Sequence, residues 1–171
     1  MNYLIESKGK IIILSSHAHT FVKNDKLNIK DFFEPSKGTS IPLIQYGTSK
    51  LFNVLISKQI HRLYNQYGVR CNAIHPGNIS TGIGKDEFGF VYKLVAPILE
   101  PTFFKNVFEG TQTTLYLASS PDVEDISGKY FQDNDLKEPS SLAKDEKLAS
   151  ELWEFSEEIC KTHLENFTFK I

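Results

Sequence analysis

Hydrophobic and polar positions change rhythm along the chain and predict strands and helices in turn. Residues 10–15 hold an apolar, β-branched run, which is typical of a strand buried on both faces of a parallel sheet. Residues 46–67 repeat apolar side chains at three- and four-residue steps, as does a helix that buries one face. Gly68 follows and is a natural end for this helix. We expect two further strands at 69–75 and 128–132.

Two more helices are expected at 102–119 and 142–164, whereas prolines and glycines leave the stretch 17–44 irregular. Strands alternating with helices predict the α/β class, with parallel strands joined by right-handed crossover helices. This order is one half of a doubly wound Rossmann fold. The expected buried side of the helix at 102–119 consists of Phe104, Val107, Phe108, Thr111, Leu115, Leu117 and Ala118.

Length and composition narrow the class of protein. A chain of 171 residues with 40% hydrophobic and 23% charged residues suits one globular domain. The net charge of -2 and the scattered basic residues give no nucleic-acid-binding tract. No apolar run has the length of a transmembrane segment. We therefore expect a cytoplasmic domain, with Cys71 and Cys160 as structural thiols. The alternative is association with a membrane or organelle through an amino-terminal part that this sequence lacks.

Tyr46 and Lys50 are the first candidates for chemistry. Four residues apart on a helix, they project from the same face, one turn apart. A nearby positive charge favours the phenolate form of a tyrosine. Such a pair can exchange a proton with an alcohol or carbonyl oxygen. The alternative is a surface helix in which the ring packs and the lysine is solvated.

Polar residues also follow the first two expected strands, at the ends where open α/β sheets bind ligands. Ser15 and Ser16 come after the first strand, and residues 76–81 (PGNIST) come after the second. These segments could bind a ligand or could be ordinary turns. His17 and His19 have a spacing compatible with a metal, but no cluster of further ligands accompanies them, so we expect solvated histidines and no metal site.

Taken together, these motifs resemble the short-chain dehydrogenase/reductase family. The resemblance rests on the serines after an apolar strand, YGTSK at 46–50, and NAIHPG at 72–77 with Thr81. It is closest to the branch of retinol dehydrogenases and WW-domain oxidoreductases, because KLFNVLISKQIHR, GTQTT and SGKYF also look like that branch. It covers the chain from about Gly9 to about Trp153, as a single partial domain over residues 1–171.

The resemblance implies roles for individual residues. Tyr46 would exchange a proton with the substrate, Lys50 would favour the phenolate and hold the nicotinamide ribose, and Ser16 would hydrogen-bond the substrate oxygen. The cofactor, NAD or NADP, would lie along Pro76, Gly77, Asn78, Ile79 and Thr81. The reaction would be hydride transfer between an alcohol and an aldehyde or ketone. A hydrophobic, retinoid-, steroid- or lipid-like substrate would contact Ser16, His17 and Phe88.

The family's amino-terminal, dinucleotide-binding half has no counterpart in this sequence. No G-x-x-x-G-x-G turn is present to hold the pyrophosphate, and the strand at 10–15 would be left at an open edge. We therefore expect a truncated chain that binds the cofactor weakly when alone. The alternatives are a catalytically inactive interaction module and a small enzyme that dimerises. A homodimer could form through the helices at 46–67 and 102–119.

Overall fold

The computed structural model describes residues 1–23, 27–33, 41–79 and 105–164. In these residues four strands form one sheet in the order β1-β2-β3-β4. The parallel neighbours β1, β2 and β3 match the expected strands, and β4 adds an antiparallel edge. The strands are β1 (Lys10–Leu14), β2 (Arg70–His75), β3 (Tyr130–Gln132) and β4 (Asp135–Lys137).

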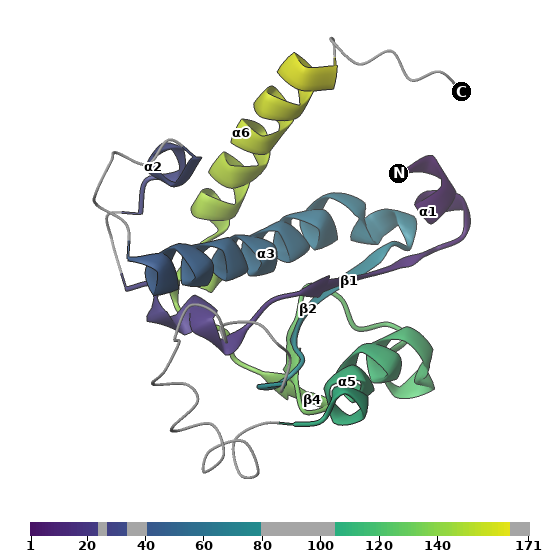
Figure 1. Cartoon of the computed structure of the whole chain (residues 1–171). Helices are drawn as coiled ribbons and strands as arrows, with labels where there is room; N and C mark the ends of the chain where they lie inside the picture. Colours follow the sequence, from purple (N-terminus) through teal and green to yellow (C-terminus); the bar gives the residue numbers. More distant parts are fainter. Residues whose placement is uncertain (24–26, 34–40, 80–104, 165–171) are drawn as a thin grey trace, which may run out of the picture.

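Helices cover both faces of the sheet, which confirms the α/β class. α3 and α6 lie over one face and α5 over the other (Figure 1). The α-helices are α1 (Asn2–Glu6), α2 (Ile29–Phe33), α3 (Pro42–Tyr64), α5 (Val107–Ser119) and α6 (Glu146–Leu164). Short 3₁₀ helices are η1 (His17–Phe21), η2 (Asn65–Tyr67), η3 (Pro121–Val123) and η4 (Leu142–Lys144).

Neighbouring residues of β2 supply the two halves of the core. Ala73 packs in a cluster with the buried stripe of α3 and with α6, whereas Ile74 packs on the other face with Leu117 of α5 and Phe131 of β3. Successive side chains of a strand point to opposite faces. β2 is thus buried on both faces, whereas β1, for which the apolar run predicted burial on both faces, is only partly buried and ends in the exposed Leu14.

The central helix α3 follows the predicted pattern closely. Leu51, Val54 and Leu55 are fully buried, and the chain leaves the helical region at Gly68, whose φ of +86° suits glycine. The helix begins at Pro42, one turn before the expected start, because proline is well accommodated in the first turn of a helix. Tyr46 is consequently one turn inside the helix.

The expected buried side of α5 is confirmed at Leu117 and wrong at its other described positions, and Phe104 lies outside the described residues. Val107, Phe108 and Leu115 are exposed, and the buried positions are Gly110, Thr113 and Leu117. The small residues face inward because the neighbouring chain comes very close. A Cβ on Gly110 would lie 2.2 Å from Cδ1 of Ile79.

A hairpin extends the sheet where the sequence predicted only a solvated surface. Asp133 and Asn134 join β3 to β4 and both have positive φ, at 57° and 60°. Asp and Asn tolerate this conformation better than other non-glycine residues, so the dipeptide was the available signal for the turn. β1 lies at the other edge of the sheet, as expected, and Leu14 is 51% exposed. No helix in the described ranges is both long and apolar enough to cross a membrane.

Candidate active site

The carboxyl ends of β1 and β2 meet at one edge of the sheet. The two strands are parallel with Leu14 opposite Ile74, and the amide of Ser15 donates a 2.7 Å hydrogen bond to the carbonyl of Ile74. The segments that follow, 15–16 and 76–79, therefore start side by side. The candidate segments after these two strands are thus brought together at the edge where ligands bind in this kind of sheet.

Two side-chain hydrogen bonds attach α3 to this edge. Ser15 Oγ donates to the carbonyl of Lys50 at 2.7 Å, and Asn53 Nδ2 donates to the carbonyl of Leu14 at 2.8 Å. Ser15 is nearly fully buried, so its bond is shielded from water. These bonds fix the part of α3 that carries Tyr46 and Lys50 against the end of β1.

A close backbone contact adds to this arrangement. Gly47 is buried, and a Cβ there would lie only 2.7 Å from the carbonyl oxygen of Ala18 in η1. Glycine therefore lets α3 approach η1 more closely than any other residue would. The segment that begins at Ser16 is held beside the turn of α3 that carries Tyr46.

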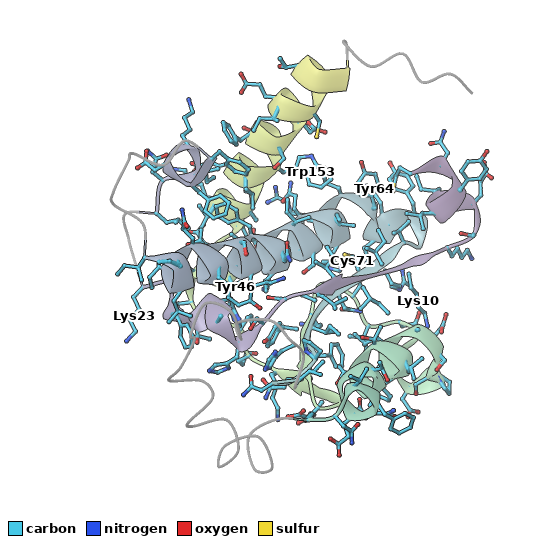
Figure 2. The ribbon with its side chains drawn as sticks, viewed as in Figure 1. Lys10, Lys23, Tyr46, Tyr64, Cys71 and Trp153 are labelled. Carbon is cyan, nitrogen blue, oxygen red and sulfur yellow. The ribbon has the colours of Figure 1, made fainter. Side chains whose placement is uncertain are left out.

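Tyr46 and Lys50 are in direct contact, as their spacing predicted. The ammonium nitrogen of Lys50 lies 5.5 Å from the centre of the Tyr46 ring, which is cation–π geometry. The Tyr46 side chain lies on the amino-terminal half of α3 (Figure 2) and is 47% exposed. No described carboxylate pairs with Lys50, so its ammonium can bind a ligand.

Ser16 caps η1 and keeps a hydrogen for donation. Its Oγ accepts a 3.2 Å hydrogen bond from the amide of Ala18. A hydroxyl that accepts in this way still has its own O–H to donate. The hydroxyl of Ser16, the phenol of Tyr46 and the ammonium of Lys50 are thus carried by adjoining segments, and together they can bind an oxygen and exchange a proton with it.

His19 is a buried structural residue, which corrects the expectation of a solvated histidine. Its Nε2 accepts a hydrogen bond from the amide of Ser140 at 3.1 Å, so Nδ1 carries the hydrogen and donates to the carbonyl of Ser16 at 2.7 Å. Burial lowers the pKa of His19, which keeps the ring neutral. The residue therefore fixes the backbone of Ser16 and has no nitrogen left for a metal.

His17 and His75 also lie at this edge. The exposed ring of His17 is 6.2 Å from that of Phe21 and 6.3 Å from that of His75, between centroids. His75 ends β2 and is buried, and its pKa falls to about 4, mainly because of burial and then because of His17. Sequence analysis did not single out His75, although its place at a strand end was a signal. Within the described ranges, no three potential ligands gather to hold a metal ion.

The segment 76–79 runs along the start of α5. The amide of Lys105 donates a 2.6 Å hydrogen bond to the carbonyl of Asn78, and Gly77 has a φ of +93° where a Cβ would meet the Lys105 side chain. Lys105 also forms an ion pair with Asp133, and the hydrogen bond from Lys105 lowers the pKa of Asp133. No sequence pattern distinguished Lys105 or Asp133 from other charged residues. Thr81 and Phe88 lie outside the described residues.

Comparisons with known sequences agree with these motifs, although no protein-family model matches the chain. The WW domain-containing oxidoreductase of Pongo abelii is 36% identical over 160 residues, covering 91% of this chain and 38% of that protein. The short-chain dehydrogenase TIC 32 A, chloroplastic, of Brassica napus is 37% identical over 87% of this chain and 46% of that protein. Human retinol dehydrogenase 14 is 34% identical, covering 87% of this chain and 43% of that protein. The chain thus spans less than half the length of these relatives.

Solved structures share the fold. A putative uncharacterized protein from Mycobacterium paratuberculosis has a TM-score of 0.63 at 24% identity, covering 90% of this chain and 50% of that one. A 4-hydroxyisoleucine dehydrogenase mutant complexed with NADH and succinate has a TM-score of 0.52 at 20% identity, covering 77% of this chain and 48% of that one. A gluconate 5-dehydrogenase from Burkholderia cenocepacia in complex with NADP and tartrate has a TM-score of 0.54 at 16% identity, covering 77% of this chain and 46% of that one.

The relatives align with nearly the whole of this chain, and the fold of the solved structures places it in the later part of their sequences. The motifs at the carboxyl ends of β1 and β2 are those on which the expected family rested. The chain therefore belongs to the short-chain dehydrogenase/reductase family and corresponds to the carboxyl-terminal part of its sequences.

Proposed function

We propose that this chain supplies the catalytic part of an NAD(P)-dependent oxidoreductase that interconverts an alcohol and an aldehyde or ketone. The observation that carries the proposal is the contact between Tyr46 and Lys50 on a helix that Ser15 attaches to the carboxyl end of β1. The phenol of Tyr46, the ammonium of Lys50 and the hydroxyl of Ser16 are then all carried by segments next to the carboxyl end of β1. The names of the relatives, which include a retinol dehydrogenase and a WW domain-containing oxidoreductase, support the same class of reaction.

Each side chain has a distinct task in this proposal. Ser16 donates a hydrogen bond to the substrate oxygen, and Tyr46 takes the hydroxyl proton during oxidation or returns it during reduction. Lys50 stabilises the phenolate and holds hydroxyl groups of the cofactor ribose. The nicotinamide cofactor, when bound, accepts or supplies the hydride.

The residues present fit the nicotinamide half of the cofactor better than its other half. Lys50 forms no ion pair with a described residue, and the backbone at 76–79 with Thr81 offers polar groups of the kind that a ribose and a carboxamide need. The sequence contains no glycine-rich G-x-x-x-G-x-G turn for the pyrophosphate. The proposal therefore includes weak binding of NAD or NADP by this chain alone, and it makes no choice between the two.

The proposed substrate is a hydrophobic alcohol or aldehyde of retinoid, steroid or lipid-like character. Phe21 is 42% exposed and contacts His17 close to the candidate active site, which offers an apolar surface there. Phe88 would add to this surface. The retinol dehydrogenase among the relatives is consistent with such a substrate.

Saturation-transfer difference NMR with NADH tests the site on the chain as it stands. We expect transfer to the nicotinamide and adjoining ribose protons and little transfer to the adenine protons. Lys50→Met should abolish it, because the ribose loses its cationic partner. Lys147→Met removes an equally charged side chain that is 86% exposed on α6, and should leave the signal intact. Equal transfer to both ends of NADH, or loss in both variants, would contradict the proposal.

Turnover is tested by joining the chain to the amino-terminal half of retinol dehydrogenase 14. With an all-trans-retinol substrate, Tyr46→Phe should lower kcat by at least about 100-fold, because general acid–base catalysis contributes about 10² to 10⁴. Tyr67→Phe removes a phenol of similar exposure and should have no effect. Turnover that persists in Tyr46→Phe would rule out the assigned role.

A catalytically inactive interaction module is the second candidate. It is favoured by the position of β1 at the edge of the described sheet, where Leu14 is exposed and a strand from another protein could be added. The two candidates differ in the NADH experiment, since an interaction module has no reason to contact the nicotinamide through Lys50.

A homodimer remains part of the proposal. Phe108 and Leu115, seven residues apart on α5, are 74% and 54% exposed, and apolar side chains this exposed can pack against a second copy. Phe108→Glu should convert a dimer to a monomer in size-exclusion chromatography with light scattering. A monomeric parent chain would exclude this contact.

A further inference from the structure

A hollow of about 640 Å³ lies beside the second half of α3, whereas Tyr46 lies near the start of that helix. It is bordered by the second half of α3, by the residues that lead into β3 and by the first turn of α6. α6 packs against α3 (Figure 1), and this packing forms one side of the hollow. Since Gly128 and Lys129 come before β3, the hollow adjoins the amino end of that strand. Its size is within the range of small-molecule sites.

Positive charge dominates its lining. Four basic side chains, those of Lys58, Arg62, Lys129 and Lys144, line the hollow with two carboxylates, those of Asp145 and Glu146, and Lys144 forms an ion pair with Glu138. The two carboxylates compensate this positive charge only in part. The hollow therefore has a surplus of cationic groups within a small volume.

The carboxylate of Asp145 is already engaged elsewhere. Its Oδ1 accepts a 3.0 Å hydrogen bond from the amide of Leu148, so it caps the start of α6. Glu146 is 85% exposed and stands 4.0 Å from Arg62, a distance and exposure at which an ion pair contributes little. Among the described ion pairs, neither carboxylate is paired with Lys58 or Lys129.

Lys58 and Lys129 have no ion-pair partner among the described residues. Lys58 is partly buried, and burial followed by repulsion from Lys129 lowers its pKa. The neighbouring His61 has a pKa lowered by burial and then by the same Lys129. Glu138 responds in the opposite sense, since its bond to Lys144 and the charges of Lys58 and Lys129 all lower its pKa. Lys58, His61 and Glu138 therefore lie in one region of positive electrostatic potential.

The floor of the hollow is held by hydrogen bonds to β2. The amide of Gly128 donates to the carbonyl of Cys71 at 2.7 Å, and the amide of Lys129 donates to Asn72 Oδ1 at 3.0 Å. The backbone that carries Lys129 is thus fixed before any ligand arrives. A fixed site binds more tightly because less ordering is needed.

We propose that this hollow is a binding site for a small phosphorylated ligand, separate from the candidate active site. A compact anion with several charges can contact Lys58 and Lys129 together and relieve their mutual repulsion. Arg62 can add charge-assisted hydrogen bonds to phosphate oxygens. The predominantly charged lining favours a diphosphate-type group over an apolar molecule.

Isothermal titration of the full chain with sodium pyrophosphate tests this site, at constant ionic strength. We expect saturable one-to-one binding with a Kd of about 1 mM or lower, corresponding to about 4 kcal/mol, and weaker binding of inorganic phosphate.

Matched charge variants locate the binding. Lys129→Gln, at an exposed position, and Lys58→Gln should each weaken pyrophosphate binding about tenfold, as expected for the loss of one close charge. Lys147→Gln removes the same charge from α6 outside the hollow and should change the Kd less than twofold. The absence of saturable binding, or equal weakening in all three variants, would overturn the proposal.

Discussion

Ser15 Oγ donates a hydrogen bond to the backbone carbonyl of Lys50, across 35 positions of the sequence. The bond joins the end of β1 to the helix turn that carries the Tyr46–Lys50 pair. Asn53 makes a second connection of the same kind, to the carbonyl of Leu14. The Tyr46–Lys50 pair is therefore positioned by its neighbours on the strand and helix, and the neighbours can be tested separately from the pair.

Ser15→Ala should lower the free energy of unfolding by about 1 kcal/mol, the usual net value of one intramolecular hydrogen bond. Urea denaturation followed by circular dichroism measures the change. The matched control is Ser49→Ala, which removes a hydroxyl that bonds only within α3, to the carbonyl of Tyr46. If both alanine variants cost the same, the bond from Ser15 to Lys50 has no special part in holding α3 to β1.

Gly47→Ala should destabilise the protein even though alanine is the better helix former by about 1 kcal/mol. The new methyl group would lie 2.7 Å from the carbonyl oxygen of Ala18, so α3 and η1 must move apart. Overpacking of this kind typically costs about 1–3 kcal/mol. A rise in the thermal midpoint would show that the contact is looser than described.

Cys160 should react with a thiol reagent in the native protein, and Cys71 should not. Cys160 is exposed on α6, whereas Cys71 is fully buried in β2, and burial raises the pKa of the Cys71 thiol to about 12. Since the thiolate is the reactive form, Ellman's reagent should titrate one thiol natively and two in denaturant. Cys160→Ser should abolish the native reaction, and Cys71→Ser should leave it unchanged. Two fast native thiols would contradict this.

The sequence predicted the main elements because their patterns are local and strong. The apolar run of β1 and the stripe of Leu51, Val54 and Leu55 on α3 needed no tertiary information. The motif YGTSK likewise identified Tyr46 and Lys50, which the structure brings into contact. Chemistry carried by adjacent helix positions is the part of a site that sequence reasoning can reach.

Other features depended on tertiary contacts. Phe108 and Leu115 looked like the inner face of α5, but close approach of Ile79 selects Gly110 for that side. His19 looked like a loop histidine, and its bonds to Ser16 and Ser140 connect segments 121 residues apart in sequence. No local pattern encodes such pairings.

His75 should make the protein less stable in acid. Its pKa in the folded protein is about 4, against 6.5 for an unburied histidine, so below pH 6.5 the unfolded chain binds the proton more readily. The free energy of unfolding should therefore be highest, as far as His75 affects it, above about pH 6.5, and it should fall by up to about 3 kcal/mol as the pH drops toward 4. Urea titrations at a series of pH values measure this slope.

Replacement of the ring separates His75 from the other groups that titrate in this range. His75→Gln cannot be protonated, so its stability should depend less on pH between 4 and 6.5 than that of the parent chain. His17→Gln removes an exposed ring from the same edge and should keep most of the slope, although it removes the repulsion that His17 exerts on His75. An unchanged slope in His75→Gln would mean that another group governs the acid response, with the buried His19 as the next to replace, because burial lowers the pKa of His19 in the same direction.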